Sequence, residues 1–484
     1  MRKLQRFLAC ALVVSTTASP IIAQEQPAGT GATDFVTTER DRLVQQIESW
    51  ESVLADWERR AKIGSIKSDY DVRVVATFDP GTAKFEPRPG GVYFYENVDR
   101  QSPFAHAPDP RPESKSSVIV VGDAVTKEII AHYEFPPEMF SSVHTTVMSP
   151  DGRYLYIVGP RPGVSNEDYQ ALGTPGTLIK VDALTLQPVS QLTVGGRIHH
   201  GQIFQDRYIL IDTFAREENG LDISLFDPVT DEIIGGVRDE DLGGGTATAF
   251  TDGEYIYALM EPPGYGPLSM SGYVAATNLG RGRVVALRPF WVAKIDPETW
   301  EVVREYPYPG YRGDWIEFDA AREHMFIPAA GSGSLTKISL ETGDVVWHQP
   351  TGVGPYGAEL TADESEVWVA DKGEATGFFG RTITVIDNAS GRHQATLFAG
   401  YSIDHVLLSP NGKEMWATSN RESRIYVFDA STREQMTLID MPTTGGAHGL
   451  VWVHHDENGN SRVVADQGGF HNGINPRLGR PLEY

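Results

Sequence analysis

A seven-fold repeat is the feature that most constrains the fold of this chain. A β-branched strand, a polar turn containing Thr or Ser, and a second strand recur in copies that begin at Val118, Leu178, Ile223, Val292, Leu335, Ile383 and Ile425. The turn residues run from Thr126 to Thr432, about 51 residues apart on average, which suits one four-stranded blade per repeat. With 49 Gly and 31 Pro for tight turns, the pattern predicts an all-β, seven-bladed β-propeller.

The two ends of the repeat array predict how the ring closes. Each copy after the first follows another hairpin, of which the SPDG turn at Ser149–Gly152 and the SPNG turn at Ser409–Gly412 are the clearest signals. The hairpin at Val118 has no inner hairpin before it, and the last inner hairpin, Gly449–Asp466, has no outer one after it. We therefore expect both chain ends to share one blade, which disfavours an open two-sheet sandwich.

The N-terminal region predicts export and an added helix. Residues 1–23 carry Arg2, Lys3 and Arg6 before an apolar run, which is typical of a signal peptide and predicts a periplasmic protein. Residues 24–67 form a polar segment and an amphipathic helix, with an apolar face of Leu43, Ile47, Trp50, Leu54 and Trp57. Residues 68–484 form the propeller. No later apolar run is long enough to span a membrane.

Cysteine content and charge exclude several functions. Cleavage of the signal peptide removes Cys10, the only cysteine, so the mature chain has no thiolate nucleophile or thiolate metal ligand. A net charge of −24 repels phosphate backbones and excludes nucleic acid as a partner. This negative charge either keeps the surface solvated or attracts a basic redox partner.

Histidines gather where the inner strands of the blades begin. Alignment by the hairpin turns places these residues at the axis: His144, His199 or His200, Thr246, Asp314, Tyr356, His405 and His448. His471 follows the last inner strand and could fold over the same face. One such His alone is explained as a hydrogen-bonded channel residue, but several buried together favour the neutral, metal-binding form. We expect a multinuclear site, and the divalent affinity order favours copper over zinc.

The neighbouring histidines set a condition on this prediction. Adjacent side chains of a strand point to opposite faces. His199 and His200 can therefore both face the axis only if the strand contains a β-bulge. Otherwise one of the two acts in the second shell.

The segments VHTTVMSPDG, RIHHGQIFQDRYILID and GAHGLVW resemble the His-bearing blade starts of the nitrous oxide reductase propeller, a copper-binding family. This chain lacks that family's Cys-containing domain, has Thr246 and Tyr356 at two His positions, and adds Asp314. A one-domain exported propeller with His and Asp is more similar to the thiocyanate dehydrogenase family. The resemblance implies two or three copper ions, held by His144, His199, His200, Asp314, His405, His448 and His471.

The same resemblance implies a copper-dependent oxidoreductase that converts thiocyanate to cyanate and sulfur. It calls for a base and a cation near a small anionic substrate, for which Glu261, Lys115 and Lys84 are the candidates. Each is otherwise explained as a solvated loop charge. We expect an external electron acceptor such as a cytochrome. The chain could also form a homodimer.

Three alternatives remain at this point. The chain could be a non-catalytic propeller of the YVTN type that binds or scaffolds, and such a protein would hold no tight metal. It could be a nitrous oxide reductase-like copper enzyme with another small substrate. It could also be a subunit of a quinone- or haem-linked dehydrogenase, although the chain has no CxxCH haem attachment.

Overall fold

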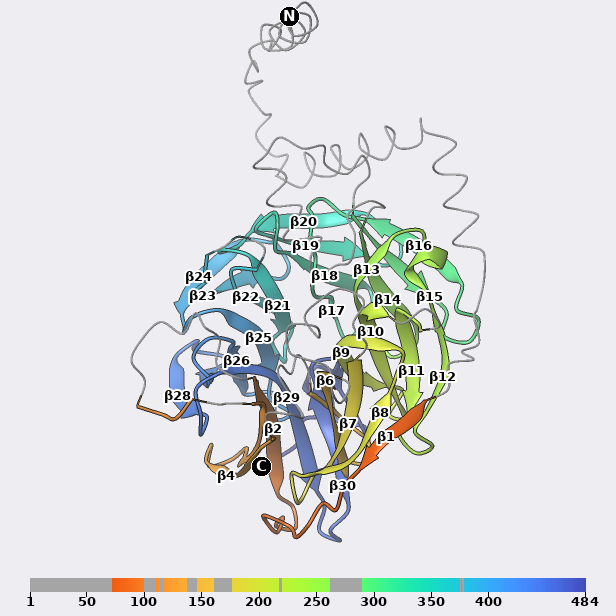
Figure 1. Cartoon of the computed structure of the whole chain (residues 1–484). Helices are drawn as coiled ribbons and strands as arrows, with labels where there is room; N and C mark the ends of the chain where they lie inside the picture. Colours follow the sequence, from red (N-terminus) through yellow and green to blue (C-terminus); the bar gives the residue numbers. More distant parts are fainter. Residues whose placement is uncertain are drawn as a thin grey trace, which may run out of the picture.

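Seven antiparallel sheets surround a central axis in the computed structural model of the chain (Figure 1). The structure describes residues 72–99, 110–113, 116–136, 146–160, 176–216, 220–261, 290–374, 376 and 378–484. The predicted signal peptide and the predicted helix within 24–67 lie outside these residues. In the described part, the seven-bladed, all-β architecture is confirmed.

Six blades are built from four consecutive strands, innermost first. Blade 1 contains β5 (Thr146–Met148), β6 (Tyr154–Pro160), β7 (Gly176–Asp182) and β8 (Pro188–Thr193), with β1 (Arg73–Thr77) added beyond β8. Blade 2 contains β9 (Gly196–Phe204), β10 (Tyr208–Arg216), β11 (Ile223–Asp227) and β12 (Glu232–Val237). Blade 3 contains β13 (Gly245–Thr251), β14 (Ile256–Glu261), β15 (Trp291–Ile295) and β16 (Val302–Pro307).

The next three blades follow the same order. Blade 4 contains β17 (Glu317–Phe318), β18 (His324–Ala329), β19 (Ser334–Ser339) and β20 (Val345–Pro350). Blade 5 contains β21 (Pro355–Leu360), β22 (Glu366–Asp371), β23 (Thr382–Asp387) and β24 (His393–Phe398). Blade 6 contains β25 (Ile403–Leu408), β26 (Glu414–Ser419), β27 (Arg424–Asp429) and β28 (Gln435–Asp440).

Blade 7 closes the ring with strands from both chain ends, as expected, but its composition differs from the prediction. It contains β29 (Gly446–His455), then β2 (Val92–Asp99), β3 (Val118–Asp123) and β4 (Ile129–Glu134). The second strand is therefore β2, which the repeat pattern did not reveal. The strand β30 (Ser461–Asp466) pairs with the other edge of β29 and leads to β31 (Gly469–Phe470).

The outer hairpins repeat because one turn repeats. In blade 1 the amide of Thr185 donates to Asp182 Oδ1 at 2.9 Å, and in blade 6 Thr432 donates to Asp429 Oδ1 at 2.7 Å. The residue after the Thr or Ser has a positive φ in every blade: Lys127, Leu186, Asp231, Trp300, Gly343, Gly391 and Arg433. An Asp side chain that accepts hydrogen bonds from the amides of its own turn stabilises this positive φ in residues other than glycine. The Asp and Thr of most copies thus fix the hairpin locally, with Ser339 replacing the Asp in blade 4 and Ser390 replacing the Thr in blade 5.

Aromatic side chains join the closing blade to its neighbour. Phe94 of β2 packs edge-on against Trp416 of blade 6, with ring centroids 5.1 Å apart. Trp416 in turn packs against Trp452 of β29 at 5.5 Å. All three side chains are buried, so the N-terminal and C-terminal strands are held in the ring by one shared core.

Short helical turns complete the described structure. The helix α5 (Asp239–Leu242) lies between blades 2 and 3, and the 3-10 turn η1 (Pro476–Leu478) lies in the C-terminal segment. Among the described residues, no helix has the length and apolar character needed to cross a membrane.

Candidate metal centre

A β-bulge lies at the first half of the inner strand in blade 2. Ile198 pairs with Thr213 and Gly201 pairs with Ile211, so His199 and His200 both oppose Asp212. The extra residue turns both imidazoles to the same side, and their ring centroids lie 3.9 Å apart. The β-bulge that His199 and His200 need in order to face the axis together is therefore present.

The other His-bearing inner strands contain the same irregularity. In blade 6, Asp404 and His405 together oppose the single residue Thr418. In blade 7, His448 and Gly449 oppose Asn97. Gly449 has a φ of +95°, and a Cβ there would lie 3.3 Å from Asn97 Oδ1. With these bulges, the rings of His405 and His448 lie 4.9 Å apart between their centroids.

Three imidazoles from three different blades meet at the axis. His200, His405 and His448 each place one ring nitrogen within 4.8 Å of the others. Their exposed fractions are 1%, 0% and 1%. His199, His200 and Asp212 form a second group that meets the same distance criterion and shares His200. Two adjacent groups joined by one residue are an arrangement suited to more than one metal ion.

Carboxylates and a phenol hold the rings in place. Asp404 forms an ion pair with His448 Nδ1, and Asn420 Nδ2 lies 3.2 Å from the same nitrogen. Tyr356 Oη lies 3.1 Å from His200 Nε2, and Asp212 Oδ1 lies 3.4 Å from His199 Nδ1. Partners of this kind fix the tautomer and orientation of metal-binding imidazoles.

Burial keeps His200 and His405 neutral. Burial lowers the pKa of His405 to about 3, and burial together with His448 and His405 holds the pKa of His200 well below its usual value. Burial alone would raise the pKa of Asp404, but His448 and Lys372 hold it well below the usual range. The site therefore offers neutral nitrogen donors beside an ionised carboxylate, which is the form that binds metal.

His405 supplies the clearest test of whether a metal fits. Both of its ring nitrogens are buried and have no hydrogen-bond partner in the described structure. A buried imidazole without partners is costly unless something binds it. Three buried imidazoles with a carboxylate in support match the donor set of copper or zinc. The residues present therefore fit a metal centre.

An ion-pair network lies beside the histidines, on the side where the inner strands begin. Lys372 Nζ lies 2.7 Å from Asp404 Oδ1, 3.2 Å from Glu374 Oε2 and 3.7 Å from the centre of the Tyr356 ring. Arg312 pairs with Asp314 at 3.1 Å. Two buried cations therefore lie on this side of the site, each paired with carboxylates, and Glu374 lies within 3.4 Å of both.

The predicted acids of this region belong to the same network. Asp314 is fully buried, and burial raises its pKa to about 7 although Arg312 lowers it. Glu261 is buried at the end of β14, and its charge acts on Arg312. Asp314 therefore interacts electrostatically with Arg312 and Asp404, and it belongs to neither of the two His-containing ligand groups found among the described residues.

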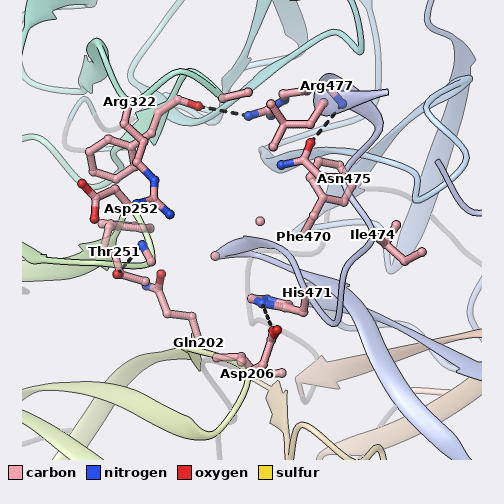
Figure 2. Close-up of a pocket in the computed structure, with 18 of the residues that line it drawn as sticks. Gln202, Asp206, Thr251, Asp252, Arg322, Phe470, His471, Ile474, Asn475 and Arg477 are labelled. Atoms are coloured by element: carbon pink, nitrogen blue, oxygen red, sulfur yellow. Dashed lines mark hydrogen bonds and ion pairs between the residues drawn. The ribbon is translucent and has the colours of Figure 1, made fainter. Parts of the chain in front are cut away.

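Two predicted site residues lie elsewhere. His471 is buried at the opposite end of the axis, where its Nε2 lies 2.8 Å from Asp466 and its ring lines a cavity (Figure 2). The C-terminal segment crosses the inner-hairpin turns, since Asn472 N donates to Asp206, and this path carries His471 away from the cluster. The exposed Lys84 lies next to the β7–β8 turn, where its amide donates to the Leu184 carbonyl.

The remaining predicted residues are only partly placed. His144 and Lys115 lie outside the described residues, as does the side chain of Thr246. Sequence reasoning missed Asp212, Asp404, Lys372 and Arg312. Asp404 directly precedes His405 in the bulge, so the pair Asp-His at a strand start was an available signal. Lys372 and Arg312 follow strand ends in other blades, and nothing local distinguishes them from solvated loop charges.

The fold and the site together define a β-propeller with a buried histidine cluster on its axis. No protein-family model matches the chain, and no curated protein matches it. Among solved structures, a dihydro-heme d1 dehydrogenase, NirN, is 14% identical with a TM-score of 0.46, over 78% of this chain and 79% of that one.

Two further structures lie at the same level of similarity. The Kuenenia stuttgartiensis hydrazine synthase is 14% identical with a TM-score of 0.46, over 65% of this chain and 90% of that one. A functionally unknown protein from Desulfotomaculum acetoxidans is 12% identical with a TM-score of 0.48, over 73% and 98%. Likenesses this low carry no information on activity, and the fold assignment rests on the strand topology.

Proposed function

We propose that this protein is an exported copper-dependent oxidoreductase whose metal centre lies on the propeller axis. The observation that carries the proposal is the convergence of His200, His405 and His448, with both nitrogens of His405 lacking a hydrogen-bond partner among the described residues. A binding or scaffold propeller gains nothing from three buried imidazoles at one point. The shared residue His200 supports a centre with more than one ion.

Each residue around the proposed metal centre has its own role. His200, His405 and His448 hold one ion, and His199 with Asp212 extends the site from His200. Asp404 orients His448, and Tyr356 orients His200. When bound, copper accepts electrons and acts as a Lewis acid.

Thiocyanate is the substrate that we propose to test first, because it is small, anionic and oxidisable at sulfur. Lys372 and Arg312 would hold it on the side of the site where the inner strands begin, in exchange for one of the carboxylates that pair with them. Thiocyanate and one water give cyanate, sulfur, two protons and two electrons. The electrons pass to an external acceptor, and two equivalents of a one-electron carrier such as a cytochrome complete the balance. Asp314 and Glu261 are the nearby carboxyl groups that can take up a proton.

Metal content tests the proposal first. The full chain is purified, reconstituted with copper, and measured by elemental mass spectrometry. We expect two or three copper ions per chain, reduced in His448→Ala and unchanged in His393→Ala, which alters an exposed His of β24. Wild-type protein that retains no copper would leave the non-catalytic propeller as the better description.

Activity is measured next on the loaded protein. Thiocyanate consumption and cyanate formation are followed with an artificial electron acceptor, in wild-type protein and in Lys372→Met. We expect turnover in the wild type and a raised KM in the variant. A copper-loaded wild type that leaves thiocyanate unchanged would favour a copper enzyme with another small substrate.

A further inference from the structure

A cavity of about 410 Å³ lies at the end of the axis opposite the strand starts that carry the histidines (Figure 2). Its walls come from the inner-hairpin turns of blades 2, 3 and 4 and from the C-terminal segment Gln467–Arg480. This volume falls within the range of sites for small molecules. The proposed metal chemistry does not use it.

One buried acceptor in the cavity wall has no donor. Gln202 is 1% exposed, and its Nε2 donates to the Ala249 carbonyl at 2.8 Å. This bond fixes the amide, and its Oε1 has no hydrogen-bond partner in the described structure. A Cβ on the lining residue Gly468 would lie 2.6 Å from that oxygen. Oε1 is itself buried and glycine is the residue that fits beside it, so a hydroxyl or amine of a ligand that enters the cavity would supply the missing donor.

The buried charges in the wall are already matched. Arg477 forms ion pairs with Glu317 and Glu359, so its positive charge is neutralised from two sides. Asp319 accepts from its neighbours and pairs with His324 at 2.7 Å.

The other charges of the cavity have both signs, including the exposed Arg480 at its rim. His471 lies between Asp466 and Asp206. Arg322 and Asp252 line the same wall with opposite charges (Figure 2). A charged ligand would bring an unmatched charge into this half-enclosed site, which disfavours ions relative to neutral polar molecules.

Apolar surface completes the lining. Phe250, Phe318 and Phe470 all contribute to the wall. Aromatic faces beside fixed hydrogen-bonding groups suit a molecule that has both C–H surface and hydroxyl groups. The side-chain amides and carboxylates supply acceptors for several hydroxyls, and Arg322 supplies donors.

We propose that this cavity binds a neutral, hydroxyl-rich molecule of monosaccharide size, with one hydroxyl donating to Gln202 Oε1. The proposal stands apart from the metal centre, since it uses none of the residues placed there. It assigns a second site to the propeller, on the face formed by the inner-hairpin turns.

Calorimetric titration of the full chain tests the ligand class. The probes are D-glucose, D-galactose and D-mannose, with D-gluconate and D-glucosamine as charged analogues of similar size. We expect at least one neutral sugar to bind, and each charged analogue to bind at least ten-fold more weakly than that sugar. Binding of gluconate or glucosamine as tightly as the neutral sugars, or binding of no neutral sugar, would overturn the proposal.

Variants then locate the site. Gln202→Met removes the fixed acceptor and should weaken the bound sugar at least ten-fold. Gln191→Met is the matched control, because Gln191 is a buried glutamine that donates to Thr177 in blade 1, away from the cavity. If Gln202→Met does not fold, Arg322→Gln changes a half-exposed lining residue and should weaken binding several-fold. Unchanged affinity in the folded variant would refute the site.

Discussion

Replacement of His405 by Leu should stabilise the metal-free protein. At neutral pH the imidazole is neutral, because burial lowers its pKa to about 3. It then buries one N–H donor and one acceptor that have no partner among the described residues. Each such group costs about 1–3 kcal/mol. The ring recovers part of this through its contact with Trp315, 4.8 Å away, worth about 0.5–1.5 kcal/mol. The free energy of unfolding should therefore rise by about 0.5–5.5 kcal/mol in His405→Leu.

Copper should make the wild type more stable than His405→Leu, which reverses the order expected for the metal-free proteins. A ligand at one thousand times its dissociation constant stabilises the native state by about 4 kcal/mol. The wild type should gain this stabilisation and His405→Leu should lose most of it. Thermal unfolding followed by circular dichroism, with and without copper, measures both effects. A shift of about 2 °C or less per kcal/mol is expected for a chain of this size.

His348→Leu is the matched control for this prediction. His348 is also a partly buried imidazole, but its Nδ1 lies 2.9 Å from Thr336 Oγ1. Its replacement leaves the buried Thr336 hydroxyl without that partner and should destabilise the protein by about 1 kcal/mol, with the copper response unchanged. A metal-free His405→Leu protein that is less stable than the wild type would refute the reasoning about unpartnered nitrogens. A full copper response in that variant would remove His405 from the ligand set.

Three further predictions concern the supporting residues. Asp404→Asn removes the carboxylate that orients His448, and equilibrium titration should show copper affinity reduced about 10- to 100-fold. An unchanged affinity would mean that Asp404 pairs with Lys372 but does not orient the metal ligand. Gly449→Ala places a Cβ at φ +95° beside Asn97, and chemical denaturation should show that the free energy of unfolding falls by about 1–2 kcal/mol. Gly459→Ala is the control, because its φ is +82° and nothing surrounds the added Cβ, so it measures the backbone strain alone. Burial raises the pKa of Asp371 to about 6 although Thr382 and Thr384 donate to it, so the folded state holds this proton more tightly than the unfolded chain. This carboxyl should therefore lower the stability by about 2 kcal/mol as the pH rises from 4 to 6, and the slope should be absent in Asp371→Asn.

The sequence by itself determined the number of blades and the form of their hairpins. Each outer hairpin depends on a few adjacent residues, since Asp429 caps the turn that contains Thr432 and the SPNG turn places Gly412 at φ +73°. Such contacts are local, so they recur wherever the motif recurs and can be read from one chain. The positions of His199, His200, His405 and His448 at strand starts followed from the same repeat.

Only the tertiary structure decided how the ring closes and what surrounds the histidines. The repeat did not reveal that β2 pairs with β29, because pairing between residues far apart in the chain leaves no local pattern. Asp404 and Lys372 become neighbours of His448 through the arrangement of three blades, and Lys84 and His471 are carried away from it by the paths of their segments. Periodicity fixes which residues start a strand, whereas the bulges and the packing of distant blades determine which side chains meet.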